Sequence, residues 1–209
     1  MSRTRKYKSK RHRRRIAESS DSDDSDDDNL DIKVVRNHIY FWCEVTKKSC
    51  LELSLKLSDV FNDMKLLHLT GDEITPIYLH INSNGGDGDA AIAVVDHMKS
   101  LIRQGANIVT IVEGNASSAA SIISVCGSER RIRPNAYIRI HEFTTGIFGK
   151  KSELDDEHGN LSKFEDNMIN IYKQNTSMNK TQLKKILSRE IDLQPAECIQ
   201  HGLVDSIQD

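Results

Sequence analysis

Two glycine-bearing turns constrain the fold of this chain more than any other feature, because each follows a run of β-branched residues and precedes a helix-forming segment. The first turn is Asn82-Ser83-Asn84-Gly85-Gly86, which follows residues 77–81, and the second is residues 114–118, which follows residues 107–112. Strand, tight turn and helix in this order need helix-length crossovers, which are typical of parallel sheets. We therefore predict an α/β fold with a mainly parallel sheet and flanking helices.

The other apolar runs extend this alternation along the chain. Further strands are predicted within residues 34–42, 136–140 and 203–207. Apolar residues at helical spacing predict helices over residues 49–68, 90–102, 119–125, 152–175, 181–187 and 195–202. The segment 152–175 carries more apolar residues than a free surface helix needs, so we predict that it packs against the same helix of a second subunit.

Charge divides the chain into two parts. Residues 1–17 carry nine Lys and Arg and no acidic residue, whereas residues 18–31 carry eight Asp and Glu and no Lys or Arg. Such blocks bury too little apolar area to offset the entropy of ordering. We predict a disordered charged arm over 1–31 and one folded domain over 32–209. Contact with nucleic-acid phosphates is an alternative role for the basic part of the arm.

The composition argues against several classes of protein. The four cysteines lie in apolar segments without metal-ligand spacing, so we predict buried, reduced thiols and expect no metal and no cofactor. The apolar runs are shorter than the roughly 18 residues of a membrane span, and no secretory signal follows the basic start. We therefore expect a soluble, cytoplasmic protein.

Ser118 is the first candidate for a functional residue, because it ends the second turn and begins a helix. A serine in this place exposes its hydroxyl, and the N–H of Ala119 can bind a developing oxyanion. Gly86 can offer a second N–H, since a glycine lets the backbone approach a substrate closely. Ser117 and Ser121 are alternatives on spacing alone, and a serine here also commonly serves as a helix N-cap.

His141 is the candidate general base, because it follows the strand predicted at 136–140 and would lie beside Ser118 if the two strands are neighbours. A serine–histidine pair also needs an acid that orients the imidazole and stabilises its charged form. Glu190 and Asp192 are both candidates for this acid, and the residue pattern leaves the choice between them open.

Taken together, these segments resemble the ClpP family of self-compartmentalising serine peptidases. The resemblance extends from about Asn37 to Ile207, and the stretches that carry it are residues 81–86, 114–118, 134–141 and 196–205. It implies a ClpP/crotonase-like fold in which the helix at 152–175 is a protruding handle that joins two stacked rings. It further implies Ser118 as nucleophile, His141 as base, Glu190 as acid, and Gly86 and Ala119 as the oxyanion hole.

The resemblance implies a serine endopeptidase that hydrolyses protein or peptide substrates through an acyl-enzyme inside a ring-shaped chamber. The chain has no Gly-x-x-x-x-Gly-Lys phosphate-binding loop, so any ATP-driven unfolding would need a separate AAA+ ATPase. Some positions depart from the family pattern: Asn84 stands in place of Pro, Glu142 in place of Gln and Glu190 in place of Asp. The alternatives are a viral procapsid maturation peptidase, a crotonase-like acyl-CoA enzyme and a non-catalytic ClpP-like scaffold subunit.

Overall fold

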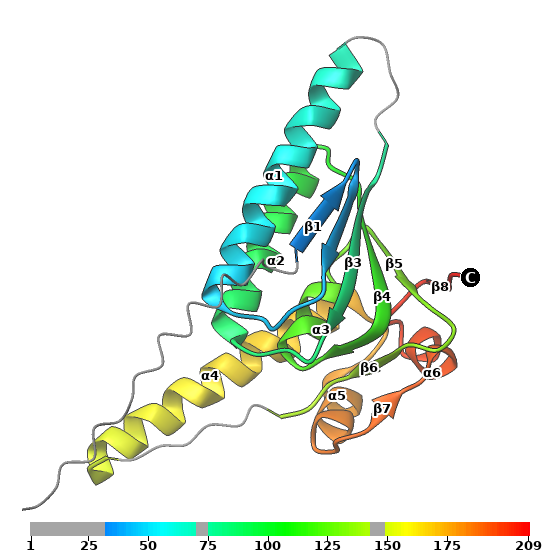
Figure 1. The fold of residues 1–209 in the computed structure, drawn as a ribbon. Helices are drawn as coiled ribbons and strands as arrows, with labels where there is room; N and C mark the ends of the chain where they lie inside the picture. The colour runs from blue at the N-terminus through cyan, green and yellow to red at the C-terminus, as the bar shows by residue number, and fades with distance from the viewer. Residues whose placement is uncertain (1–31, 70–74, 143–148) are drawn as a thin grey trace, which may run out of the picture.

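The computed structural model describes residues 32–69, 75–142 and 149–209 (Figure 1). Its helices are α1 (Lys47–Leu69), α2 (Gly88–Arg103), α3 (Ala119–Ser124), α4 (Lys151–Asn175), α5 (Lys180–Leu187) and α6 (Pro195–Gln200). Its strands are β1 (Ile32–Val35), β2 (His38–Phe41), β3 (Ile77–Ser83), β4 (Ile108–Ser117), β5 (Glu129–Ile132), β6 (Tyr137–Arg139), β7 (Asp192–Leu193) and β8 (Ser206–Ile207). The charged arm predicted over 1–31 lies outside the described residues.

The strands form one sheet in the order β1-β2-β3-β4-β5-β8, and β6 pairs with the far end of β4 and with β7. The pairs β2–β3, β3–β4, β4–β5, β4–β6 and β5–β8 are parallel, whereas β1–β2 and β6–β7 are antiparallel. The predicted α/β fold with a mainly parallel sheet is therefore confirmed. Because β3 and β4 are parallel neighbours, Gly85 and Gly86, which follow β3, and Ser118, which follows β4, lie at the same edge of the sheet.

Helices α1 and α2 cover one face of the sheet (Figure 1). Alternate strand residues such as Ile39, Phe41, Leu79 and Ile81 are fully buried, as expected for the side of each strand that faces a helical layer. On α2, apolar residues at helical spacing, among them Val94, are buried with them. This core fixes the positions of the strands whose ends carry the candidate site.

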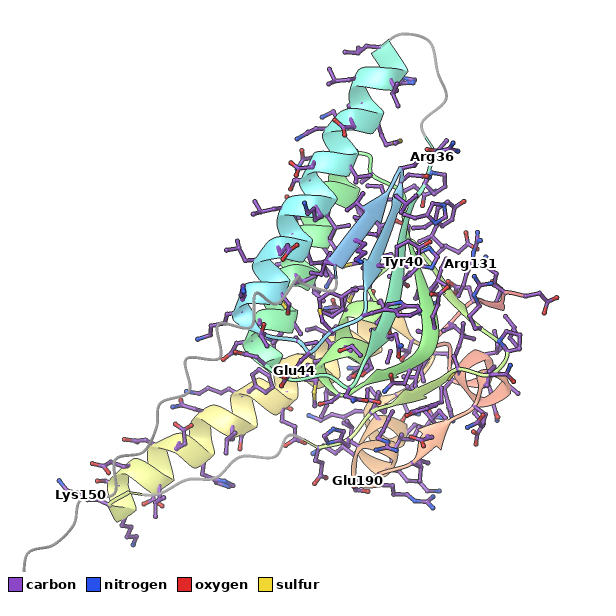
Figure 2. All side chains as sticks on the ribbon, in the orientation of Figure 1. Arg36, Tyr40, Glu44, Arg131, Lys150 and Glu190 are labelled. Carbon is purple, nitrogen blue, oxygen red and sulfur yellow. The ribbon has the colours of Figure 1, made fainter. Side chains whose placement is uncertain are left out.

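The opposite face of the sheet carries a stack of aromatic and histidine rings. His38 stacks on Tyr78 with a centroid distance of 4.7 Å, and Tyr40 stacks on His80 at 4.4 Å. The Nδ1 atom of His38 lies 2.8 Å from Nε2 of His80, and Nδ1 of His80 lies 2.9 Å from Oε1 of Glu113. Figure 2 shows Tyr40 on the side of the sheet away from α1.

The sequence-based prediction of the strands was wrong at three places, one of which is the short strand β7, which it did not include. It also missed β5, because the sequence Glu-Arg-Arg-Ile lacks the apolar alternation of a strand. In the structure, Arg131 pairs with Glu129 and Arg130 pairs with Asp205 at the sheet surface. It also placed a turn over 114–118, whereas β4 continues to Ser117. Gly114 has a φ of +79°, and the register with β3 shifts after Ile81, so the strand bends there and continues.

Helix α4 extends away from the body of the protein (Figure 1), which agrees with the expected protruding helix. Its first half is exposed, with Leu154 at 37% exposure, whereas Met168, Ile171 and Tyr172 are buried within the same chain. The C-terminal third of the helix packs beside α3 and α5 of its own chain, and packing of the helix against a second subunit stays a prediction.

Candidate active site

Ser118 lies between β4 and α3 in a strained backbone conformation, with φ of +53° and ψ of −126°. Such a conformation is rare for a residue other than glycine, and in proteins it is concentrated at functional sites. Although Ser118 occupies the N-cap position of α3, its hydroxyl makes no capping hydrogen bond. The side chain is therefore not used in the way that a serine at a helix start ordinarily is.

The two alternative serines are occupied by other contacts. Ser117 is buried, and its Oγ accepts a hydrogen bond from Nδ2 of Asn115 at 3.2 Å. Ser121 is fully buried, and its Oγ donates to the backbone carbonyl of Ser118 at 2.6 Å. Among these three serines, Ser118 alone is partly exposed and has a hydroxyl without a hydrogen bond to another described residue.

His141 lies near Ser118 because β6, the strand that precedes His141, pairs with the end of β4. Ser117 lies opposite Arg139 in this parallel register, and the N–H of Ser118 donates to the carbonyl of Arg139 at 2.8 Å. Two residues beyond Arg139, the His141 side chain lines the same small cavity as Ser118. The predicted neighbourhood of these two residues is therefore present in the structure.

This cavity has a volume of about 20 Å³ and is lined by Gly86, Gly88, Ser118, Ala119, Ile122, His141, Phe164, Met168 and Tyr172. A space of this size holds about one water molecule. A substrate side chain can enter if the lining residues shift, and a methionine such as Met168 adapts its shape easily. The sequence motifs did not point to the α4 residues Phe164, Met168 and Tyr172 as part of the site. Their spacing of four residues places them on one face of the helix.

The imidazole of His141 is held in one tautomer by its neighbour. Its Nδ1 lies 2.8 Å from the backbone carbonyl oxygen of Glu142. Since a carbonyl oxygen only accepts, Nδ1 carries the proton in this bond, and the neutral ring keeps its lone pair on Nε2. This is the tautomer that a general base needs when it takes a proton from a serine hydroxyl through Nε2.

Gly85 and Gly86 bring the first turn against the second. Gly85 has a φ of +96°, and a Cβ atom on it would lie 2.7 Å from Cβ of Ser118. Gly86 has a φ of +142° and packs against the backbone of Val45, whose N–H donates to the carbonyl of Gly85 at 2.8 Å. No other residue type fits these positions without a backbone shift.

Two backbone donors near Ser118 are available for a ligand. Neither the N–H of Gly86 nor that of Ala119 donates a hydrogen bond to another described residue. Both residues line the cavity that Ser118 shares with His141. The arrangement therefore has a free hydroxyl, a histidine with the required tautomer and two free N–H groups around one space, which is the set of groups that acyl transfer requires.

The two acid candidates occupy different environments. Asp192 accepts a hydrogen bond from Nε of Arg139 at 2.6 Å, and this contact raises the pKa of the arginine. Glu190 lies at the surface on the segment between α5 and β7 (Figure 2), and its carboxylate makes no hydrogen bond or ion pair with another described residue. Neither carboxylate contacts His141 in this structure, as far as the described residues extend.

The pairing of β6 with β7 ends two residues short of a Glu190–His141 pair. Ile138 lies opposite Leu193, and Arg139 lies opposite Asp192. Extending this antiparallel register by two residues sets Glu190 opposite His141, and side chains so placed are within contact distance. The ladder ends before that pair, because the N–H of Glu142 bonds the carbonyl of Leu187 instead.

An asparagine network that the sequence analysis did not recognise joins the two turns. Nδ2 of Asn115 donates to Oδ1 of Asn84 at 2.8 Å, and the N–H of Asn115 donates to Oδ1 of Asn82 at 3.3 Å. Asn84, which stands where the resembling family usually has proline, therefore gains a side-chain contact that fixes the turn. The three asparagines also line an open pocket of about 610 Å³ with Trp42 and Glu44.

Within residues 32–69, 75–142 and 149–209, no three or more His, Cys, Asp or Glu side chains are grouped so that they could hold a metal ion. In these ranges there is also no helix with the length and apolar character needed to cross a membrane.

Comparison with known proteins identifies the family. The family model described as Clp protease matches residues 52–209. The ATP-dependent Clp protease proteolytic subunit 1 of Chlamydia muridarum is 31% identical over 185 residues, which cover 86% of this chain and 91% of the relative. The ATP-dependent Clp protease proteolytic subunit 2 of Treponema denticola is 31% identical over 158 residues, covering 75% and 78%. The chain described here belongs to the Clp protease family.

Proposed function

We propose that this protein is a serine endopeptidase in which Ser118 is the nucleophile, His141 the general base, and the N–H groups of Gly86 and Ala119 the oxyanion hole. The relatives are named as proteolytic subunits, which supports the class of reaction. The observation that carries the residue assignment is the common cavity of Ser118, His141, Gly86 and Ala119. The serine hydroxyl and both N–H groups make no hydrogen bond to another residue that the structure describes.

In the proposed reaction, Nε2 of His141 takes the proton of the Ser118 hydroxyl while Oγ attacks the carbonyl carbon of the scissile peptide bond. The negative charge that develops on the carbonyl oxygen is bound by the N–H groups of Gly86 and Ala119. His141 then donates its proton to the leaving amine, which gives an acyl-enzyme. A water molecule, deprotonated by the same histidine, hydrolyses the ester and restores the serine.

Glu190 is the proposed acid of this site. In the structure, the carbonyl of Glu142 holds the imidazole tautomer that a base requires, but a neutral carbonyl stabilises the imidazolium less than a carboxylate does. The β6–β7 register favours Glu190 for this role, since two more pairs would set it opposite His141. Asp192 is already paired with Arg139, which leaves it less suited to the same function.

The protein is further proposed to act as one subunit of a ring-shaped oligomer, with protein or peptide substrates and a separate AAA+ ATPase in the cytoplasm. The relatives' names describe subunits of an ATP-dependent protease. The exposed apolar side chains of α1, Leu51 at 63% and Leu55 at 56% exposure, lie one turn apart and offer a surface for subunit contacts. Cys50, Cys126 and Cys198 are buried and form no disulfide, which is compatible with a reducing compartment.

A serine-reactive fluorophosphonate probe tests the residue assignment. We expect the wild-type protein to be labelled on Ser118, as located by peptide mass spectrometry, and to cleave fluorogenic peptides. Ser118→Ala should lose labelling and lower kcat by several orders of magnitude without a change in melting temperature. Ser117→Ala serves as the matched control, because this neighbouring serine is buried and bonded to Asn115.

The outcomes separate the candidate functions. Labelling at Ser117 or Ser121 would move the nucleophile, and unchanged hydrolysis by Ser118→Ala would remove it from the mechanism. A folded, assembled protein without labelling or hydrolysis would indicate a scaffold subunit, whereas turnover of an acyl-CoA thioester without labelling would indicate a crotonase-like enzyme.

A further inference from the structure

Two buried hydroxyl groups connect helix α4 to the nucleophile turn. The Oη atom of Tyr172 lies 2.6 Å from Oγ of Ser121, and Oγ of Ser121 lies 2.6 Å from the backbone carbonyl oxygen of Ser118. Tyr172 is 1% exposed and Ser121 is 0% exposed. Figure 1 shows the C-terminal part of α4 next to α3, the helix that carries Ser121. The two hydroxyl groups are therefore shielded from water, and they end on the backbone of the partly exposed Ser118.

The direction of these hydrogen bonds follows from the acceptor at their end. The Ser118 carbonyl can only accept, so the Ser121 hydroxyl donates its one proton to it. The Ser121 oxygen must then accept from Tyr172, which donates its phenolic proton. Burial raises the pKa of Tyr172 well above its ordinary value, so the proton stays on the ring oxygen. Each hydroxyl proton thus has one defined acceptor.

The peptide unit at the end of this chain has two functions in the proposed site. The carbonyl of Ser118 and the N–H of Ala119 belong to the same planar trans peptide, so they point in opposite directions. A bond that fixes the direction of the carbonyl therefore also fixes the direction of the N–H of Ala119, a residue that lines the cavity with His141. Hydrogen bonds to the carbonyl also polarise the peptide and strengthen its N–H as a donor.

The conformation of Ser118 makes such support necessary. A φ of +53° is strained for a residue other than glycine and persists only where the surroundings impose it. On its amino side, the Ser118 N–H is held by the carbonyl of Arg139 at 2.8 Å. On its carboxyl side, the carbonyl accepts from the N–H of Ser121 at 2.9 Å and from the Ser121 hydroxyl. Between these two attachments, the Ser118 hydroxyl bonds to none of the residues in 32–69, 75–142 and 149–209.

We propose that Ser121 and Tyr172 are positioning residues that hold the Ser118–Ala119 peptide so that its N–H is directed at the oxyanion of the reaction. This inference rests on the proposed function, since it assigns a support to the oxyanion hole named there. It also makes the root of α4 part of the site: Phe164, Met168 and Tyr172 lie four residues apart on one face of that helix and line the cavity.

Kinetics of Tyr172→Phe, Ser121→Ala and the double variant test the proposal in the full-length protein. Tyr172→Phe removes one oxygen and keeps the ring, so packing is nearly unchanged. We expect each variant to lower kcat for a fluorogenic peptide by about 10- to 100-fold, less than the loss of an oxyanion donor itself, with KM unchanged. Because the two hydroxyls act in one chain, the double variant should lose no more than the worse single variant.

Inhibitor binding gives a readout that a merely structural role would not move. A peptide boronate, which forms a tetrahedral adduct with a nucleophilic serine, should bind more weakly by the same factor as kcat/KM falls. A product peptide, which forms no such adduct, should bind equally well to all variants. This separation of tetrahedral from ground-state affinity distinguishes a misdirected N–H from a general loss of packing.

Two matched controls are present in the chain. Ser124 is equally buried in α3, but its hydroxyl donates to the carbonyl of Ser121 rather than to that of Ser118. Tyr40 lies on the far face of the sheet (Figure 2). Ser124→Ala and Tyr40→Phe should therefore keep wild-type kcat and boronate affinity.

Unchanged kcat in both Ser121→Ala and Tyr172→Phe would overturn the proposal, and so would an equal fall in Ser124→Ala. If Tyr172→Phe does not fold, Ser121→Ala decides by itself, because it breaks the bond to the Ser118 carbonyl directly. Failure of the proposed function looks different, since Ser118→Ala would then remain active while the wild-type protein escaped the phosphonate probe.

Discussion

The Nε atom of Arg139 lies 2.6 Å from the Oδ1 atom of Asp192, and this ion pair joins β6 to β7. The carbonyl of the same arginine accepts the Ser118 N–H, so the pair supports the nucleophile turn from the side of β6. Asp192 therefore has a structural partner already, whereas Glu190 lies at the surface with its carboxylate uncommitted among the described residues.

The first prediction separates the two acids. Glu190→Gln should lower kcat by about 10- to 100-fold at constant KM, a moderate loss because the Glu142 carbonyl still holds the tautomer. Asp192→Asn should leave kcat within about threefold and cost less than about 1 kcal/mol of stability, as expected of a partly exposed ion pair. Peptide hydrolysis and thermal melting measure both effects. The reverse pattern would assign the acid to Asp192.

The second prediction concerns the first turn. Gly85→Ala should lower peptidase activity by at least tenfold and destabilise the protein by more than the about 1–2 kcal/mol of a left-handed backbone, because the new Cβ would meet Ser118. Gly105→Ala is the matched control, since Gly105 has a similar φ of +103° and open space around it. Equal melting temperatures and equal activities for the two variants would contradict the contact with Ser118.

The third prediction concerns the reactivity of the cysteines. Burial raises the pKa of Cys50 and of Cys126 to about 11, and that of Cys198 to about 12. The thiolate is the reactive form of a cysteine. At a pH below the pKa, a pKa that is higher by about two lowers the thiolate fraction about 100-fold. In the native protein at pH 8, a thiol reagent should modify the half-buried Cys43 first and the other three only on unfolding. Fast modification of Cys126 before unfolding would be inconsistent with its burial.

The fourth prediction is a pH dependence of stability from the ring stack. Burial, followed by the neighbouring His80, lowers the pKa of His38 below its ordinary value of 6.5. As the pH falls below 6.5, the unfolded chain therefore binds a proton before the folded protein does. The stabilisation is complete above pH 6.5 and is lost as the pH falls through the lower folded value. Melting temperatures between pH 7.5 and 5 measure this loss.

In this pH series, His38→Phe keeps a ring against Tyr78 but cannot titrate, so its melting temperature should fall less steeply with acidity than that of the wild type. His158→Asn, which removes an exposed histidine of α4, should keep the wild-type slope. An unchanged slope in His38→Phe would show that the stack contributes nothing to the acid sensitivity.

The fifth prediction tests the proposed assembly through the exposed part of α4. Leu154→Asp with Leu161→Asp should reduce the mass of the oligomer in analytical ultracentrifugation, because both lie on the first two-thirds of the helix, away from the cavity. Phe164 and Met168 are unsuitable for this test, since they line the space beside Ser118. Ser162→Asp, a charge at an exposed polar position of the same helix, controls for added charge. An oligomer of unchanged mass would reject this interface.

The sequence by itself determined the class of fold and the neighbourhood of the site. Periodicity and turn residues are local properties, so they predicted the parallel sheet, most of the helices and the turn with Gly85 and Gly86 at one edge of the sheet. The choice among Ser117, Ser118 and Ser121 needed the tertiary structure, because it depends on which hydroxyl already has a partner. Ser117 is bonded to Asn115. Ser121 is bonded to Tyr172, which lies 51 residues further along the chain.

Strand β5 and the burial of the α4 root were likewise decided by the tertiary structure. The Glu-Arg-Arg-Ile sequence becomes a strand because β4 and β8 pair with it on either side, a contact between distant segments that no local pattern reports. The apolar residues of α4 were visible in the sequence, but only packing divides them between an exposed half and a root that closes the cavity. Hydrogen-bond partners and burial are set by the whole chain, whereas propensity is set by neighbours in sequence.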